Sequence, residues 1–205
     1  MENRTWKKPG KRFFKKKLSG NDGRYIPVQF NGKNSGWSDG YIAFFNFIPD
    51  DGIGNGPLKK DITQSIELND YRSGNLMGGD VDFDNPLRYV CRIDDEDVDD
   101  GIAFFERMDG TKWSDWDYPV SIDDGYLNAI MYYAKKMYGK KAEVKFWLET
   151  KTNYKYKRYG SKKERMVPML VTVNHEPFAL LMPLSCNIKF EDLNQVPQAF
   201  YPRWE

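Results

Sequence analysis

The chain has 205 residues, enough for one large or two small domains with a buried core, and 40% of them are hydrophobic. The formal net charge of +1 hides an uneven distribution, because residues 1–17 carry +7, residues 151–165 carry +6 and the remainder carries −12. No secretory signal and no run of 18 apolar residues is recognisable, so we expect no membrane-spanning segment.

The first 23 residues combine lysine and arginine with glycine and proline, and they show no apolar period. This composition predicts a flexible basic arm, residues 1–23, that becomes ordered on binding. The candidate phosphate-binding cations of the arm are Lys7, Lys8, Lys11, Arg12, Lys15, Lys16 and Lys17.

After the arm, short runs rich in β-branched and aromatic residues alternate with Gly, Asn, Asp and Pro. This pattern predicts a mainly β (α+β) protein with an antiparallel β-rich body. We expect one nucleic-acid-binding domain over residues 24–190 and a C-terminal tail over 191–205. The predicted strands cover residues 24–30, 41–48, 62–68, 88–93, 102–108, 118–122, 142–150, 166–173 and 178–181.

One main helix is predicted at about residues 124–138. Asp123 or Asp124 can cap its first turn, and Gly139 is a typical C-terminal stop. An apolar stripe along this segment predicts a side that faces the core. The stripe consists of Leu127, Ile130, Met131, Ala134 and Met137.

A weak internal repeat is visible, most clearly where Ile42–Phe45 recurs as Ile102–Phe105. One interpretation is two related sub-units, residues 24–87 and 88–175. The other is chance matching among short strands, which we favour because several glycines fall where the helix of the first sub-unit should lie.

The order strand, strand, strand, helix, strand, strand from Arg88 to Val173 resembles an OB-type barrel, in which a helix lies between the third and fourth strands. The part of this segment up to the helix at Tyr126 is also similar to the single-stranded DNA-binding domains of the transcriptional positive-cofactor, PUR and Whirly class. The OB-like barrel is favoured and Whirly/PUR-like strand-and-helix repeats are the alternative. The acidic run 94–100 departs from the basic hairpin that would suit the second class. Both resemblances imply binding of single-stranded DNA.

The second basic segment, residues 151–165, lies between two predicted strands and interleaves cations with tyrosines. Cations neutralise phosphates, and aromatic rings stack on unpaired bases. The alternative is a solvated hairpin whose lysines protect a strand edge from aggregation. The candidate binding residues are Lys151, Tyr154, Lys155, Tyr156, Lys157, Arg158, Tyr159, Lys162 and Lys163.

Large aromatic side chains in polar, turn-like sequence add to this hypothesis. Trp37 and Trp113 are candidates for stacking on bases, and core packing is their alternative role. Strand alternation predicts that one ring of each Phe-Phe pair, at 44–45 and 104–105, points outward.

Motifs for catalysis or for binding a cofactor are missing. The acidic run 94–100 lacks the spacing of a calcium loop, and the sole histidine, His175, lies in a turn-like stretch. No P-loop, GxGxxG or GxSxG motif occurs. Cys91 and Cys186 lie far apart and form no CxxC pair, which favours a reducing cytoplasmic location. We therefore expect no enzymatic activity, no cofactor and no metal site.

These observations favour a sequence-nonspecific single-stranded DNA-binding protein that acts in replication, recombination or transcription, with a phage origin and the host cytoplasm as part of the hypothesis. Two alternatives stay open: an RNA-binding protein, and a structural or adaptor protein of a virion or ribonucleoprotein assembly. The expected partners are single-stranded DNA or RNA, further copies of the chain, and replication or virion proteins. No membrane partner is expected.

Overall fold

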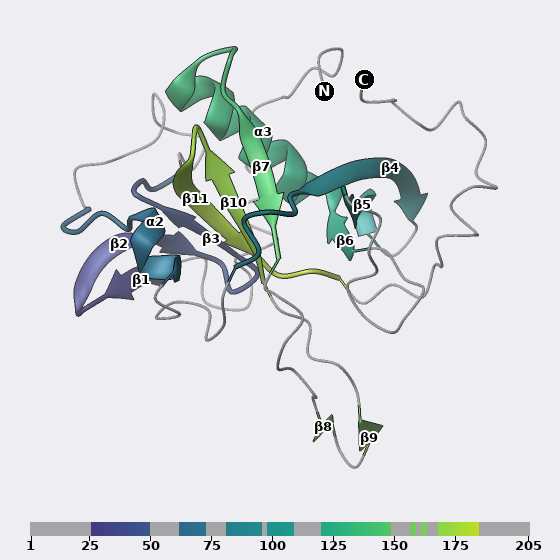
Figure 1. The fold of residues 1–205 in the computed structure, drawn as a ribbon, viewed down its shortest axis with the longest axis horizontal. Helices are drawn as coiled ribbons and strands as arrows, with labels where there is room; N and C mark the ends of the chain where they lie inside the picture. The colour runs from purple at the N-terminus through teal and green to yellow at the C-terminus, as the bar shows by residue number, and fades with distance from the viewer. Residues whose placement is uncertain are drawn as a thin grey trace.

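The computed structural model describes residues 26–49, 62–72, 81–95, 98–108, 120–148, 157–158, 161–162 and 168–184. These residues form a nine-stranded antiparallel sheet, a separate two-stranded ribbon and two α-helices (Figure 1). The mainly β, antiparallel prediction is therefore confirmed. The large sheet contains β1 (Ile26–Phe30), β2 (Lys33–Ser38), β3 (Ile42–Phe45), β4 (Leu87–Asp95), β5 (Val98–Arg107), β6 (Val120–Asp123), β7 (Val144–Trp147), β10 (Met169–Val173) and β11 (Glu176–Leu181). The ribbon pairs β8 (Lys157–Arg158) with β9 (Ser161–Lys162), and the helices are α2 (Leu68–Arg72) and α3 (Asp124–Tyr138).

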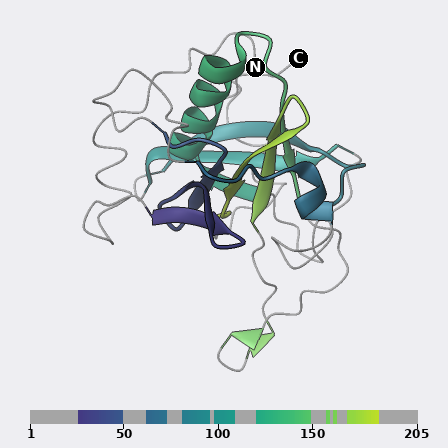
Figure 2. The same ribbon diagram turned by 90° about the vertical axis from the view of Figure 1, so that its left-hand side faces the viewer.

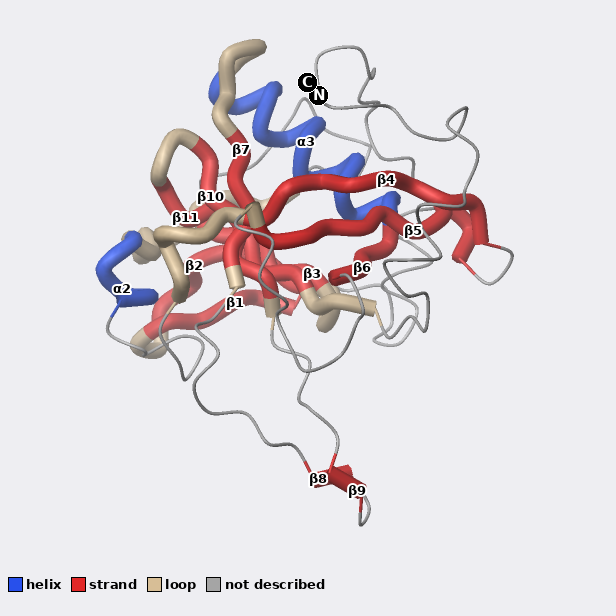
Figure 3. The backbone as a smooth tube through the Cα atoms, turned by 45° about the vertical axis from the view of Figure 1, so that its right-hand side comes forward, coloured by secondary structure: helices blue, strands red, loops and turns tan. Residues whose placement is uncertain are grey.

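The large sheet has the strand order β1-β2-β3-β11-β10-β7-β4-β5-β6 and curls into a half-barrel (Figures 2 and 3). Its two outer strands are β1 and β6. Chain that follows β11 pairs with β6, because the Leu184 N–H donates to the Ser121 carbonyl oxygen at 2.7 Å and the Ser121 hydroxyl donates to the Leu184 carbonyl oxygen at 3.1 Å. This contact protects part of the outer edge of β6.

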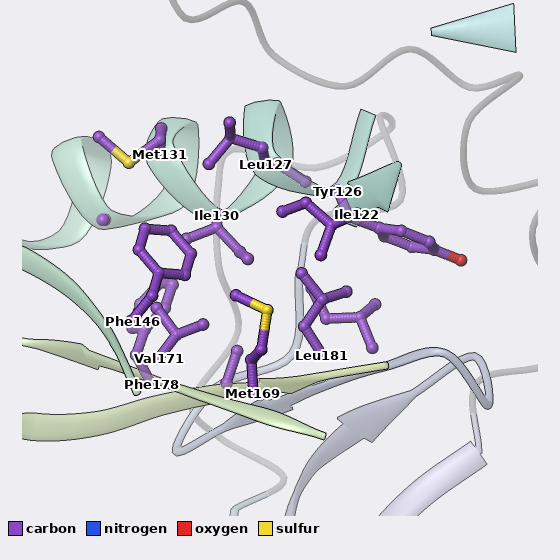
Figure 4. Close-up of a cluster of buried hydrophobic side chains, with 14 of the residues drawn as sticks. Ile122, Tyr126, Leu127, Ile130, Met131, Phe146, Met169, Val171, Phe178 and Leu181 are labelled. Carbon is purple, nitrogen blue, oxygen red and sulfur yellow. The ribbon is translucent and has the colours of Figure 1, made fainter. Parts of the chain in front are cut away.

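Helix α3 confirms the helix prediction, including both of its ends. The side chain of Asp123 accepts a hydrogen bond from the Gly125 N–H at 2.8 Å, and Gly139 ends the helix with a φ of 85°. Figure 4 shows the apolar stripe of α3 facing side chains of β7, β10 and β11. Four of the five predicted stripe residues are buried, and Met137 is partly buried against the same cluster.

The strand predictions contain one omission and one error. Strand β2 was not predicted, because its sequence is rich in turn-forming residues. It forms because Gly36 lets β2 approach β3 closely: a Cβ at this position would lie 1.9 Å from the Phe44 carbonyl oxygen. The predicted strand at 62–68 is absent. Instead, the Asn46 amide donates to the Ile66 carbonyl oxygen at 3.0 Å and accepts from the Ile66 N–H at 2.7 Å, so a side chain takes the place of a strand partner.

The sheet is covered on both faces, which corrects the expectation that one phenylalanine of each pair points outward. Phe44 and Phe105 join the core beneath α3, whereas Phe45 joins a second cluster with Ile66 and Trp147. Phe104 packs in a third cluster, and all four rings are at most 1% exposed. The chain at residues 62–67 and 81–83 provides the second cover.

The third cluster also contains Cys91, which is a free and fully buried cysteine. Burial raises the pKa of this thiol to about 11, so the thiol stays protonated at neutral pH.

The segments that suggested an internal repeat occupy non-equivalent strands. Ile42–Phe45 is the third strand of its meander, whereas Ile102–Phe105 lies in the second strand of the next meander. This difference favours the interpretation of chance matches.

Candidate nucleic-acid interface

Several strand ends meet at one end of the sheet, and we call it the attachment end. Backbone register places the first residue of β1 opposite the last residue of β2, and the start of β3 opposite the end of β11. The start of β10 lies opposite the end of β11 and beside the end of β7. The attachment end therefore comprises Ile26, Gly40–Ile42, Trp147–Leu148, Pro168–Met169 and Leu181–Met182.

Both basic segments join the sheet at this end. Residues 1–17 precede β1, and residues 151–165 connect β7 to β10. Lys151 follows Leu148 by three residues, and a chain spans at most about 3.6 Å per residue, so the second segment begins within about 11 Å of the attachment end. Two segments that are far apart in the sequence thus adjoin strands that begin or end at the same end of the sheet. In the strand order, β2, β3 and β11 separate β1 from β10.

The hairpin expected within residues 151–165 is present as β8 and β9, which lie apart from the large sheet in Figure 1. Lys157 is the register partner of Lys162, and Arg158 is the partner of Ser161.

Most of the predicted binding residues lie outside the described part of the chain. These are Lys7, Lys8, Lys11, Arg12, Lys15, Lys16, Lys17, Trp113, Lys151, Tyr154, Lys155, Tyr156, Tyr159 and Lys163. The structure describes the backbones of Lys157, Arg158 and Lys162, together with the whole of Trp37.

Trp37 is a core residue, which corrects its prediction as a base-stacking residue. Its side chain is 1% exposed and stacks on Phe44, with ring centroids 6.1 Å apart and an interplanar angle of 16°. The polar residues around it in the sequence suggested an exposed turn. In the structure Trp37 belongs to β2, a strand that is paired on both sides, and points into the core beneath α3, and the turn begins only after β2, at Asp39–Gly40.

The cations of β4, β5 and β7 already have carboxylate partners. Arg88 pairs with Glu106, Arg107 with Asp82, and Lys145 with Glu143 at 2.8 Å. Arg92 contacts both Asp94 at 2.9 Å and the buried carboxylate of Asp124 at 3.0 Å. A phosphate would have to compete with these partners.

The carboxylate of Asp82 illustrates how firmly such a cation is held. Burial opposes its ionisation, but hydrogen bonds from Asn85 and Arg107 lower its pKa overall. Phosphate neutralisation is therefore better supplied by the two basic segments than by these three strands.

The sequence did not identify one exposed aromatic residue at the attachment end, Tyr41. Its side chain is 60% exposed, and Met182 beside it is 36% exposed. The only sequence signal was its position directly after the turn residues Asp39–Gly40. That signal also fits an ordinary strand start.

A cavity of about 520 Å³ lies at the opposite end of the sheet. Among the described residues its lining includes Glu67, Tyr138, His175 and Glu176 but no lysine or arginine. The Tyr138 hydroxyl donates to Glu176 at 3.4 Å, and its pKa is raised by burial and by the Glu176 carboxylate. Two carboxylates without a lining cation disfavour phosphate binding in this cavity.

Within the described ranges, no three His, Cys, Asp or Glu side chains gather closely enough to hold a metal ion. No helix in these ranges is long and apolar enough to cross a membrane. No protein-family model, no curated protein and no solved structure matches this chain.

Proposed function

We propose that this chain is a sequence-nonspecific single-stranded DNA-binding protein. The observation that carries the proposal is that both basic segments are joined in the chain to strands that begin or end at the attachment end, namely β1, β7 and β10. Phosphates require cations, and the two segments together carry a net charge of +13 by sequence. Their interleaved aromatic residues suit unpaired bases, because every base has a face on which a ring can stack. Lysine and tyrosine in this pattern carry no base-edge code, which favours nonspecific binding.

The strand arrangement supports an OB-like identity as part of this proposal. In an OB-type barrel the first strand lies between the second and the fourth, the fifth lies beside the fourth, and a helix separates the third from the fourth. The sheet order β6-β5-β4-β7-β10, with α3 between β6 and β7, follows this scheme in an opened form. An OB-type unit would therefore consist of β4, β5, β6, α3, β7 and β10.

The OB-type arrangement also suggests a role for the β8–β9 ribbon. OB-type domains bind oligonucleotides partly with the connection between their fourth and fifth strands. Here that connection runs from β7 to β10 and contains residues 151–165. The connection between the first two strands of this unit, β4 and β5, is acidic, because it follows Asp94 and Asp95. We therefore expect the β7–β10 connection to bind the oligonucleotide.

Fluorescence anisotropy of a labelled oligo-dT with the intact chain, measured at several salt concentrations, tests the proposal. Six phosphate contacts would give a slope of log K against log salt of about −4, because each contact on a single strand contributes roughly −0.7. Mixed-sequence single strands should bind with similar affinity, and the same sequence as duplex should bind less tightly. Absence of binding at low salt would refute the proposal.

Two additional measurements separate the alternatives. An RNA oligonucleotide of the same sequence that binds much more tightly than DNA would make RNA the substrate. Size-exclusion chromatography without nucleic acid should give a small species. A large defined assembly would favour a structural role instead.

A further inference from the structure

Exposed apolar side chains gather at the attachment end. In the described part of the chain, the large apolar residues that are exposed are Tyr41, Met108 and Met182. Tyr41 and Met182 are neighbours, because the Met182 N–H donates to the Tyr41 carbonyl oxygen at 2.8 Å. Met108 follows β5, which β10, β7 and β4 separate from β11 in the strand order, so it is not part of this pair. An exposed apolar pair is more informative than a single exposed apolar residue.

The turn that presents Tyr41 is rigidly held. One oxygen of the buried Asp39 carboxylate accepts the N–H groups of both Tyr41 and Ile42 at 2.8 Å. The other oxygen accepts the Tyr126 hydroxyl at 2.7 Å, which ties the turn to α3. Around Gly40, which has a φ of 92°, a Cβ would meet no atom within 4 Å, so the space beside the turn is open. An aromatic ring on a fixed turn loses little conformational freedom when it binds a ligand.

Tyr41 lies near the starts of β10 and β1, the strands that the two basic segments precede in the chain. Ile42 lies opposite Leu181, and Leu181 lies opposite Met169, where the chain enters β10 after residues 151–165. Adjacent strands are about 4.8 Å apart, so the start of β3 is about 10 Å from the start of β10. The first residue of β1 is opposite Ser38, three residues before Tyr41.

We propose that Tyr41, flanked by Met182, is the platform on which a base of the bound single strand stacks. This inference rests on the proposed function, and it adds an aromatic site on the body of the protein to the two basic segments. A base has the flat surface that a tyrosine ring binds, and the phosphates on either side of it would face the adjoining cations. The methionine side chain adapts its shape beside the ring.

Two oligonucleotides of equal length, oligo-dT and an abasic strand with the same number of phosphates, test the inference with the full chain. Tyr41→Ala should weaken oligo-dT binding about tenfold, because a stacked base contributes roughly 1 to 3 kcal/mol, and should change abasic binding less than about twofold. Tyr41→Phe, the matched control, should retain the wild-type affinity for both strands. Circular dichroism melts of both variants check that the fold is retained.

The outcomes separate the two proposals. If the wild type binds neither strand, the proposed function fails and this inference fails with it. If the wild type binds oligo-dT and Tyr41→Ala binds it equally well, only the inference is overturned, and the patch then suits a protein partner. An equal loss for both strands would also overturn the inference, because it would show that Tyr41 does not act through the base.

Discussion

Asp39 shows how one buried carboxylate organises the surface around it. It is 7% exposed and accepts hydrogen bonds from two backbone N–H groups and from Tyr126. Burial and the nearby Asp39 carboxylate raise the pKa of Tyr126 well above its usual range, so this hydroxyl remains a donor at neutral pH. Asp39 holds the β2–β3 turn, and with it Tyr41, together with the Ser38 hydroxyl, which accepts from the Gly40 N–H at 3.0 Å and donates to the Ile42 carbonyl oxygen at 2.8 Å.

Replacing Asp39 therefore has a predictable cost. Asp39→Ala leaves three donors without their acceptor, and we expect it to lower the free energy of unfolding by about 3 kcal/mol. Tyr126→Phe removes only one of the three hydrogen bonds and should lower it by about 1 kcal/mol. Urea denaturation of both variants measures the difference. Equal stability of Asp39→Ala and the wild type would show that the turn does not depend on this carboxylate.

Trp37 and Tyr41 show why the exposure of a single aromatic residue could not be predicted from the sequence. The polar neighbours of Trp37 gave the correct local impression of a turn-rich segment, yet the ring is buried because β2 pairs with strands on both sides. Tyr41 lies four residues later and is exposed. Tertiary packing decides which of the two aromatic residues reaches solvent, and local sequence carries little information about it.

At the scale of elements, local signals predicted α3 well. Its cap, its stop and its apolar stripe are all encoded within the helix and its flanks. Strand β2 could not be found in the same way, because Gly36 is required by its close approach to Phe44 and reads as a turn residue in sequence. The segment at 62–67 resembles a strand locally, but the Asn46 side chain takes the place of a strand partner.

The β8–β9 ribbon is the element that most directly links structure to the proposed function. Its backbone register sets Lys157 opposite Lys162, so two residues of the proposed binding set occupy paired positions.

Neutralising one member of this pair should reduce binding in a specific way. Lys157→Gln should weaken oligo-dT binding at low salt and make the log-log salt slope less steep by about 0.7, the value for one phosphate contact. The matched control is Lys33→Gln, which removes an exposed lysine next to the β1–β2 turn, at the end of the sheet away from the attachment end. A salt series by anisotropy compares the variants. The same slope change in both would assign the effect to overall charge and not to the ribbon.

At the scale of the whole molecule, the sequence identified the two basic segments but not their spatial relation. Residues 1–17 and 151–165 are more than 130 residues apart. Only the sheet order shows that β1 and β10 begin at the same end of the sheet. Long-range strand pairing of this kind leaves no signal in composition or periodicity, which explains why the common end of these strands could not be predicted from the sequence.

The sheet also separates different chemistry at its two ends. The attachment end exposes Tyr41 and Met182 and adjoins the basic segments in the chain, whereas the described lining of the cavity at the opposite end includes Glu67 and Glu176 but no lysine or arginine. A single strand should therefore lie across the attachment end.

Photo-crosslinking tests this central claim most directly. Oligo-dT that carries 4-thiothymidine is irradiated with the intact chain, and mass spectrometry identifies the crosslinked peptides. The account predicts crosslinks in the peptide that contains Tyr41 and in peptides from residues 151–165. Crosslinks concentrated instead in peptides that contain Tyr138 or His175, at the opposite end of the sheet, would contradict it.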